Sequence, residues 1–402
     1  MKILLVICDG MGDRPSKHFK GKTALQATKH KNLDELAKNG SAGIMDTIAP
    51  GIRPGSDTAH LALLGHDPYK VYTGRGPFEA TGIGMDLREG DVAVRCNFGT
   101  VKNGTIVDRR AGREAFGLDE LGKALNIKIG DTEMLFKHAV GHRGALIIRG
   151  TGLSDKIGDT DPHEEGKQIK TSVALEPEAK KTAEALNEYI KKAQEILSNH
   201  PMNKEREKRG FPLANAILTR GPGLAPKIEK FEKKYGIKGG CVTATGAIAG
   251  VMKYCGLDTK LVEGRGLASD LDMKAGMALD MLKEKDFCLL HIKGCDDYSH
   301  DGNAQAKAKM IVKIDAMIGR LVKKAPKDLI IAVTADHSTP LEFKNHTSDP
   351  VPLAICGQTM RRDNTKRYDE IECAGGAIGR IKGQDLIKIL LDLAGKTQLF
   401  GA

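Results

Sequence analysis

Residues 3–7, Ile-Leu-Leu-Val-Ile, run through Cys8 into Asp9, and this step from an apolar run to an acidic turn sets the fold class. Two later runs have the same character, FCLLHIK (287–293) and LIIAVT (329–334), and each also ends in a polar, acidic segment. Short runs rich in β-branched residues are typical of buried parallel strands. A helical pattern follows the second run, at 304–323. The alternation predicts an α/β fold with a doubly wound, mostly parallel sheet.

Acidic and histidine side chains follow all three predicted strands. In an open α/β sheet, such residues gather beyond the carboxyl ends of the strands, so positions far apart in the sequence meet at one edge. Carboxylates and imidazoles together suit divalent cations of the zinc or manganese kind, which need no thiolate. Two such ions stabilise the attacking and leaving oxygens of an in-line displacement. The candidate metal ligands are Asp9, Asp296, His300, Asp336, His337 and His346.

Ser56 supplies the nucleophile that a two-metal phosphoryl-transfer site needs. It stands in Pro-Gly-Ser-Asp-Thr-Ala-His, which predicts a helix that opens at the serine and closes at Gly65. The amides and dipole of a helix N-terminus favour an alkoxide or a phosphoserine, and metal coordination would activate the weakly nucleophilic hydroxyl. Taken singly, the serine also fits an N-cap, and each ligand motif also fits a turn or a surface loop. The ordered set is far more specific than its members.

The length of the chain, 402 residues, exceeds what one hydrophobic core usually holds, so two domains are expected. Between about 86 and 235 the pattern changes to short alternating strands, turn signals and one long helix. Hairpins with a helix predict a smaller α+β lid inserted into the core. We therefore expect a discontinuous metal-binding core of residues 1–85 and 236–402 and a substrate-binding lid of 86–235, with the active site in the cleft between them.

Arginines are numerous in the predicted lid, and their forked guanidinium groups bind phosphate and carboxylate through paired hydrogen bonds. The candidate substrate ligands are Arg95, Arg109, Arg113, Arg143 and Arg220. The lid also contains Asp159-Thr-Asp161-Pro-His163, in which a carboxylate and a histidine could move a proton on and off a substrate hydroxyl. Asp161 and His163 are thus the candidate acid and base. An Asx-turn before proline explains the same segment equally well.

The composition argues against several classes of protein. The net charge of +10 suits nucleic acid as a partner, but aromatic residues make up only 4% and the lysines are interleaved with acids. An anionic small-molecule substrate explains the sign of the charge equally well. The eight cysteines are scattered, without a Cys-x-x-Cys pair, which favours buried reduced thiols.

The lengths of the apolar runs indicate where the protein is located. None is long enough for a signal peptide or a membrane span, so a cytoplasmic protein without a membrane partner is expected. The sequence leaves open whether the chain forms a homo-oligomer.

The serine and the metal-ligand candidates, in their order along the chain, resemble the alkaline phosphatase superfamily. Within it, several segments resemble the archaeal-type cofactor-independent phosphoglycerate mutases, and the likeness spans nearly the whole chain. These segments are VICDGMGDRP (6–15), PGSDTAHLALLGHDP (54–68), YTGRGPFEATGIG (72–84), DRRAGRE (108–114), DTDPH (159–163), LTRGPG (218–223) and TADHSTP (334–340). The resemblance implies an alkaline phosphatase-like core and an isomerase that interconverts 3-phosphoglycerate and 2-phosphoglycerate in glycolysis and gluconeogenesis. It also implies a phosphoserine intermediate and no need for 2,3-bisphosphoglycerate.

The resemblance further implies how the ligands divide between two metal ions. One ion is bound by Asp9, Ser56, Asp336 and His337, and the other by Asp296, His300 and His346. Manganese, zinc, cobalt and magnesium each suit part of this set. The sequence departs from the longer bacterial type at Ser338-Thr339, where glycine and asparagine more often follow the Asp-His pair.

Three alternatives stay open on the sequence alone. A phosphomonoesterase would use the same core, but its lid would not need to bind the alcohol that leaves after the phosphoryl group is transferred. A mutase for another phosphate ester, such as a phosphopentose, would differ only in what the lid fits. A non-catalytic basic nucleic-acid-binding protein would need neither the ligand set nor the serine.

Overall fold

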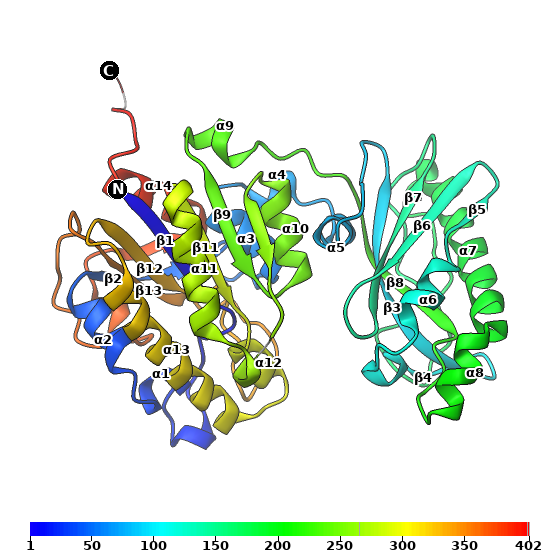
Figure 1. The fold of residues 1–402 in the computed structure, drawn as a ribbon, viewed down its shortest axis with the longest axis horizontal. Helices are drawn as coiled ribbons and strands as arrows, with labels where there is room; N and C mark the ends of the chain where they lie inside the picture. The colour runs from blue at the N-terminus through cyan, green and yellow to red at the C-terminus, as the bar shows by residue number, and fades with distance from the viewer. Residues whose placement is uncertain (265, 400, 402) are drawn as a thin grey trace. The chain divides into compact units, whose positions relative to one another are not determined.

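The computed structural model describes residues 1–264, 266–399 and 401. The chain forms two compact units, each with a β-sheet of its own (Figure 1). The core unit comprises Met1–Val71 and Glu229–Ala402, and the inserted unit comprises Tyr72–Ile228. The expected α/β class is confirmed.

The core unit is built on an eight-stranded sheet in the order β10-β9-β11-β1-β12-β13-β2-β14. Strand β13 is antiparallel to both of its neighbours, and the other pairs in this sheet are parallel. The three apolar runs of the sequence are β11, β1 and β12, which are buried and lie side by side. The strands are β1 (Lys2–Cys8), β2 (Ser41–Asp46), β9 (Gly239–Thr243), β10 (Asp258–Leu261), β11 (Phe287–Ile292), β12 (Leu329–Thr334), β13 (Val351–Cys356) and β14 (Gly379–Lys382).

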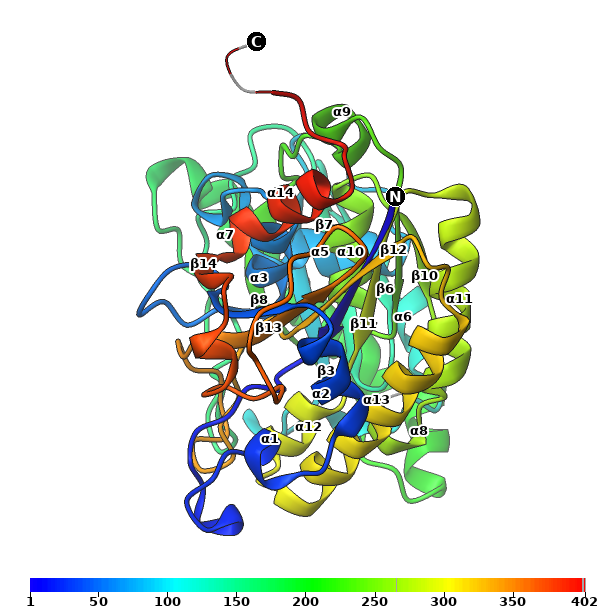
Figure 2. The ribbon, with the colours of Figure 1, turned by 90° about the vertical axis from the view of Figure 1, so that its left-hand side faces the viewer.

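Helices cover both faces of this sheet, as in a doubly wound fold. Figure 2 places α11 and α13 on one side of the strands and α3 and α14 on the other. The helix α13 turns one apolar side inward, with Met310, Ile314 and Leu321 buried at helical spacing. The helices are α1 (Ala24–Ala27), α2 (Lys31–Lys38), α3 (Ser56–Leu63), α4 (Pro68–Val71), α9 (Phe231–Tyr235), α10 (Gly246–Tyr254), α11 (Leu271–Glu284), α12 (Cys295–His300), α13 (Ala304–Lys324) and α14 (Gly383–Leu393). None of the helices within the described residues is both long and apolar enough to cross a membrane.

The inserted unit contains an antiparallel sheet in the order β4-β3-β7-β6-β5, with β8 paired to β3. Alternate residues of β3 point to opposite faces: Val94 and Phe98 pack in one core with α7, whereas Ala93 packs in another with α5. The strands are β3 (Val92–Lys102), β4 (Thr105–Asp108), β5 (Ile127–Ile129), β6 (Thr132–His138), β7 (Arg143–Arg149) and β8 (Ala216–Leu224). The helices are α5 (Arg75–Gly82), α6 (Leu118–Lys123), α7 (Lys180–Asn199) and α8 (Pro201–Lys208).

The division between the units falls earlier in the chain than the expected boundaries at 85/86 and 235/236. At the first boundary, α5 belongs to the inserted unit because it contacts β3, β7 and β8. At the second, α9 belongs to the core unit because Phe231 packs on Phe287 and Tyr235 donates a hydrogen bond to the carbonyl of Leu64.

Candidate active site

Two strand ends of the core unit bring buried carboxylates together. Asp9 stands one residue beyond β1, and Asp336 stands two residues beyond the neighbouring β12. Ligand atoms of Asp9, Asp336 and His337 all lie within 4.8 Å of one another. We call these three residues the first ligand group.

The hydroxyl of Ser56 lies against this group. Ser56 is the first residue of α3, as the sequence predicts, and it follows the extended Gly55. Its Oγ is 3.1 Å from Nε2 of His337. A helix N-terminus favours negative charge, so this position suits a serine that becomes an alkoxide or carries a phosphoryl group.

A second ligand group consists of Asp296, His300 and His346. Oδ1 of Asp296 is 3.2 Å from Nε2 of His300 and 3.4 Å from Nε2 of His346. Both rings donate their Nδ1–H, at 2.8 Å, to the main-chain carbonyls of Lys344 and Pro54 respectively. These bonds turn each Nε2 toward the carboxylate, the arrangement by which backbone carbonyls usually orient metal-binding histidines.

His337 joins the two groups. One ligand atom each from His337, Asp296 and His346 lies within 4.8 Å of the others, and the His337 ring stacks on that of His346 at 3.5 Å. His300 contacts Asp296 but is not part of this tight triplet. Burial, with a smaller effect of His346, lowers the pKa of His337 to about 3, so its ring is neutral and has a free electron pair. The structure thus brings all six candidate ligands together.

The first ligand group fits a divalent cation. Asp9 Oδ1 and Asp336 Oδ2 are buried and have no hydrogen-bond partner among the described residues. Burial and the nearby Asp9 raise the pKa of Asp336 well above its usual value. Two adjacent buried carboxylates are costly unless a positive charge compensates them. The chemistry of the donor set therefore matches a metal ion bound by carboxylates and imidazole.

Lys293 lies within the candidate site and was missed by the sequence reasoning. Its Nζ lies 3.0 Å from Asp9 Oδ2 and forms a second, shorter ion pair with Asp296. Burial opposes the charge on Lys293, but Asp9 and Asp296 outweigh it and raise its pKa. The available signal was its place in the segment that leads from β11 to Asp296.

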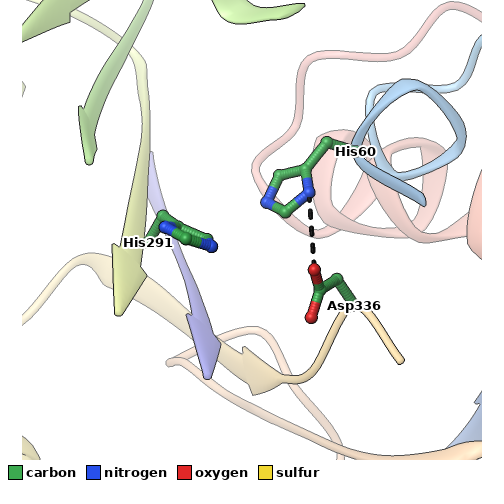
Figure 3. Close-up of side chains that lie close together, drawn as sticks. All are labelled: His60, His291 and Asp336. Atoms are coloured by element: carbon green, nitrogen blue, oxygen red, sulfur yellow. Dashed lines mark ion pairs between the residues drawn. The ribbon is translucent and has the colours of Figure 1, made fainter. Parts of the chain in front are cut away.

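Two further buried histidines, also missed, support the first ligand group. Figure 3 shows His60 and His291 beside the carboxylate of Asp336, and one ligand atom of each lies within 4.8 Å of the others. His60 donates its Nδ1–H to the carbonyl of Ser56 at 2.6 Å, and His291 Nε2 lies 3.0 Å from Asp9 Oδ2. The first contact fixes the main chain at Ser56, and the second fixes the carboxylate of Asp9. His60 could have been found from its helical spacing of four from Ser56.

The arginines of the inserted unit fall into two clusters, the first around Glu79. Arg95 and Arg220 are directly opposite each other on β3 and β8. Oε1 of Glu79 is 3.2 Å from Arg95 and 3.0 Å from Arg75. Burial would raise the pKa of Glu79, but Arg95, Arg75 and Arg143 outweigh it and lower the pKa to about 2. One carboxylate thus faces several guanidinium groups, and the cluster has a surplus of positive charge.

The second cluster lines an open pocket of about 590 Å³ in the inserted unit. Arg109, Arg113 and His163 lie at this pocket. Arg109 binds both carboxylate oxygens of the buried Asp161, at 2.9 and 2.6 Å. Burial would raise the pKa of Asp161, but the hydrogen bond from Arg109 outweighs it and lowers the pKa. His163 is about half exposed and lies 3.4 Å from Asp159.

A serine hydroxyl set against clustered carboxylates and imidazoles, on an α/β core, has the chemical parts of an enzyme that transfers phosphoryl groups. Residues 37–203 match the family described as 2,3-bisphosphoglycerate-independent phosphoglycerate mutase. A protein of that name from Methanocaldococcus jannaschii is 48% identical over 409 residues, which cover 100% of this chain and 99% of the relative. A second, from Methanothermobacter thermautotrophicus, is 44% identical over 412 residues and covers 100% of both chains.

Solved structures agree with these relatives. A cofactor-independent phosphoglycerate mutase from Thermoplasma acidophilum is 39% identical, covers 98% of this chain and 100% of its own, and has a TM-score of 0.72. A protein from Pyrococcus horikoshii, also 39% identical, covers 100% and 99% with a TM-score of 0.87. The chain belongs to the 2,3-bisphosphoglycerate-independent phosphoglycerate mutase family, which confirms the resemblance drawn from its motifs. The expected activity, that of an isomerase of the cofactor-independent type, is confirmed with it.

Proposed function

We propose that the chain interconverts 3-phosphoglycerate and 2-phosphoglycerate through a phosphoserine at Ser56, without free 2,3-bisphosphoglycerate. The observation that carries the proposal is the 3.1 Å contact between Ser56 Oγ and His337 Nε2, at a helix N-terminus and beside buried carboxylates. The names of the full-length relatives point to the same reaction. The proposal includes a place in glycolysis and gluconeogenesis and a cytoplasmic location.

Two divalent metal ions, of manganese, zinc, cobalt or magnesium, are part of the proposal. The first ligand group together with Ser56 would hold one ion, and the second ligand group would hold the other. When bound, such ions supply positive charge that stabilises the oxygens of a transferring phosphoryl group and promotes loss of the serine proton. The two unpartnered carboxylate oxygens of the first group support this assignment.

The arginines of the inserted unit would bind the substrate. Arg95, Arg143 and Arg220 surround one glutamate with surplus positive charge, and Arg109 and Arg113 line an open polar pocket. A phosphoglycerate has two anionic groups, and guanidinium groups bind both kinds. We propose that these five side chains hold the glycerate while its phosphoryl group is on Ser56.

His163 suits proton transfer better than Asp161 does. The carboxylate of Asp161 is fully buried, is bound at both oxygens by Arg109 and also accepts from the main-chain N–H of His163. Asp161 therefore remains ionised and holds Arg109 in place. The ring of His163 is accessible at the pocket, so we assign the proton transfers to it.

The proposed reaction has two halves. Ser56 first loses its hydroxyl proton to solvent water. Its Oγ then forms a bond to phosphorus as the bond from phosphorus to oxygen 3 of the substrate breaks. His163 gives its proton to the departing oxygen. In the second half, His163 takes the proton of the 2-hydroxyl, whose oxygen bonds to phosphorus as the bond to Ser56 breaks. Water must be excluded meanwhile, because hydrolysis of the phosphoserine would release free phosphate.

A time course tests the proposal. The purified chain is incubated with Mn²⁺ and 3-phosphoglycerate, free of 2,3-bisphosphoglycerate, and 2-phosphoglycerate and inorganic phosphate are followed together. Accumulation of 2-phosphoglycerate with little phosphate is the expected result. Release of mostly phosphate would identify a phosphomonoesterase instead, and no product with any of the four metals would refute the substrate assignment.

A further inference from the structure

Thr339 lies between the two ligand groups. Its hydroxyl oxygen is 3.0 Å from Nδ1 of His337 and 2.9 Å from Oδ1 of Asp296. The side chain is fully buried, and the three residues share no strand or helix. One hydroxyl therefore connects a residue of the first ligand group to a residue of the second.

The positions of the protons in these two hydrogen bonds follow from which groups can donate and which can only accept. An ionised carboxylate can only accept, so the single hydroxyl proton of Thr339 points to Asp296. Thr339 can then only accept from His337, which places the ring proton of His337 on Nδ1. The other nitrogen, Nε2, is left with its electron pair and faces the hydroxyl of Ser56. The carboxylate of Asp296 also forms the ion pair with Lys293.

The backbone is shaped to admit this connection. Gly10 has a φ of +66°, and a Cβ there would lie 2.8 Å from the Thr339 hydroxyl oxygen and 2.6 Å from Cβ of Asp296. The main-chain N–H of Thr339 donates to the carbonyl of Gly12 at 3.0 Å, which ties the loop after β12 to the loop after β1. Thr339 is thus held in place independently of its hydroxyl.

We propose that Thr339 is a positioning residue that holds His337 and Asp296 as one hydrogen-bonded unit, so that both side chains are oriented for metal binding. The proposal rests on the metal sites proposed above. It gives a role to the buried hydroxyl of Thr339, whose two hydrogen-bond partners are both candidate metal ligands.

The first test is a titration of chelator-treated protein with Mn²⁺, which measures free Mn²⁺ and needs no substrate. Thr339→Val keeps the shape and removes the hydroxyl, and Thr339→Ser keeps the hydroxyl. We expect Thr339→Val to bind Mn²⁺ about 10- to 100-fold more weakly, as loss of an outer hydrogen-bond partner typically does. Thr339→Ser should remain close to the native protein. The matched control is Thr28→Val, since the Thr28 hydroxyl is buried without a partner among the described residues.

A second measurement reads the ring of His337 directly. The ¹⁵N chemical shifts of the metal-free protein distinguish a proton on Nδ1 from one on Nε2. We expect Nδ1–H in the native protein and in Thr339→Ser, and a mixture of the two forms in Thr339→Val.

The outcomes separate this proposal from the proposed function. Native Mn²⁺ affinity in Thr339→Val, or equal weakening in Thr339→Ser, would overturn the role of the hydroxyl. Absence of any Mn²⁺ binding by the native chain would overturn it together with the metal sites. If the expected metal and ¹⁵N results appear while no 2-phosphoglycerate forms, the positioning role stands and the substrate assignment fails.

Discussion

Lys293 Nζ lies 3.0 Å from Asp9 Oδ2, and the lysine pairs with Asp296 as well. One ammonium group thus forms an ion pair with one carboxylate from each ligand group. Its side chain is only 11% exposed, so water screens these interactions weakly. Lys293 accordingly provides part of the positive charge that the clustered carboxylates need before any metal binds.

Removing that charge should make the protein depend on metal for stability. Breaking a buried ion pair typically costs about 3 to 5 kcal/mol, so metal-free Lys293→Met should unfold at a clearly lower temperature than the native protein. Added Mn²⁺ would replace the missing charge and should raise the Tm of the variant by more than it raises the native Tm. Lys388→Met, which removes an exposed pair with Asp385, is the control and should behave as the native protein. Equal Mn²⁺-induced shifts in Lys293→Met and native protein would contradict this role.

Ser56→Ala should abolish mutase turnover and leave metal binding largely intact. The serine is proposed to carry the phosphoryl group, whereas the carboxylates and imidazoles supply the other ligand atoms. Turnover and Mn²⁺ binding are measured on the same preparation, and ³²P-labelled substrate reports the phosphoenzyme in the native chain alone. Turnover by Ser56→Ala at the native rate would refute the phosphoserine mechanism.

Glu79→Gln should weaken substrate binding through the arginines that the carboxylate holds. Without the negative charge, Arg75 and Arg95 repel each other and lose their fixed positions. We expect a raised KM with a smaller change in kcat, measured by initial rates over a range of 3-phosphoglycerate concentrations. Glu89→Gln is the control, because Glu89 and Lys227 form a fully exposed pair. An unchanged KM in Glu79→Gln would show that the cluster has no part in binding.

The same glutamate gives stability a predictable pH dependence. Folding lowers the pKa of Glu79 from its usual 4.5 to about 2. Its stabilising contribution is therefore complete above pH 4.5 and is lost as the pH falls toward 2. Urea unfolding across this range should show the free-energy difference between native protein and Glu79→Gln shrinking with falling pH. A constant difference would rule out this titration.

Gly10→Ala should disturb both ligand groups. A left-handed conformation costs a non-glycine residue about 1 to 2 kcal/mol. The added Cβ would in addition meet Asp296 and Thr339 at 2.6 and 2.8 Å. Gly21→Ala has the matching positive φ, +81°, with nothing within 4 Å of the new Cβ. Urea unfolding should therefore show a larger loss of stability for Gly10→Ala, and Mn²⁺ affinity should fall in that variant alone.

Local patterns were enough to predict the part of the site that the chain presents at strand and helix ends. The runs now seen as β1, β11 and β12 are mostly apolar and almost entirely buried, and the residues that follow them carry the predicted acids and histidines. Because parallel strands end at one edge, proximity in space followed from the pattern alone.

Most of the supporting contacts could not be predicted because they join distant segments. Lys293, His291 and Thr339 each contact a carboxylate that lies far away in the sequence, and no local spacing records those contacts. The local signals were the spacing of Lys293 from Asp296 and that of His60 from Ser56. The first domain boundary was displaced because Arg75-Gly-Pro-Phe-Glu-Ala-Thr-Gly82 contains glycines and a proline, which weaken a helix pattern. Only its packing on β3 and β7 reveals that it belongs to the inserted unit.

The discontinuous core has a consequence for the order of events during synthesis. Strand β1 is made first, yet both of its partners, β11 and β12, come from the last third of the chain. The strands of the inserted unit all lie between Tyr72 and Ile228, so that sheet has every partner before the core does. Domains generally fold as units while the chain emerges. We expect the inserted unit to fold first on the ribosome. Until β11 and β12 are made, the apolar strand β1 remains unpaired, and it is the segment that we expect a chaperone to bind.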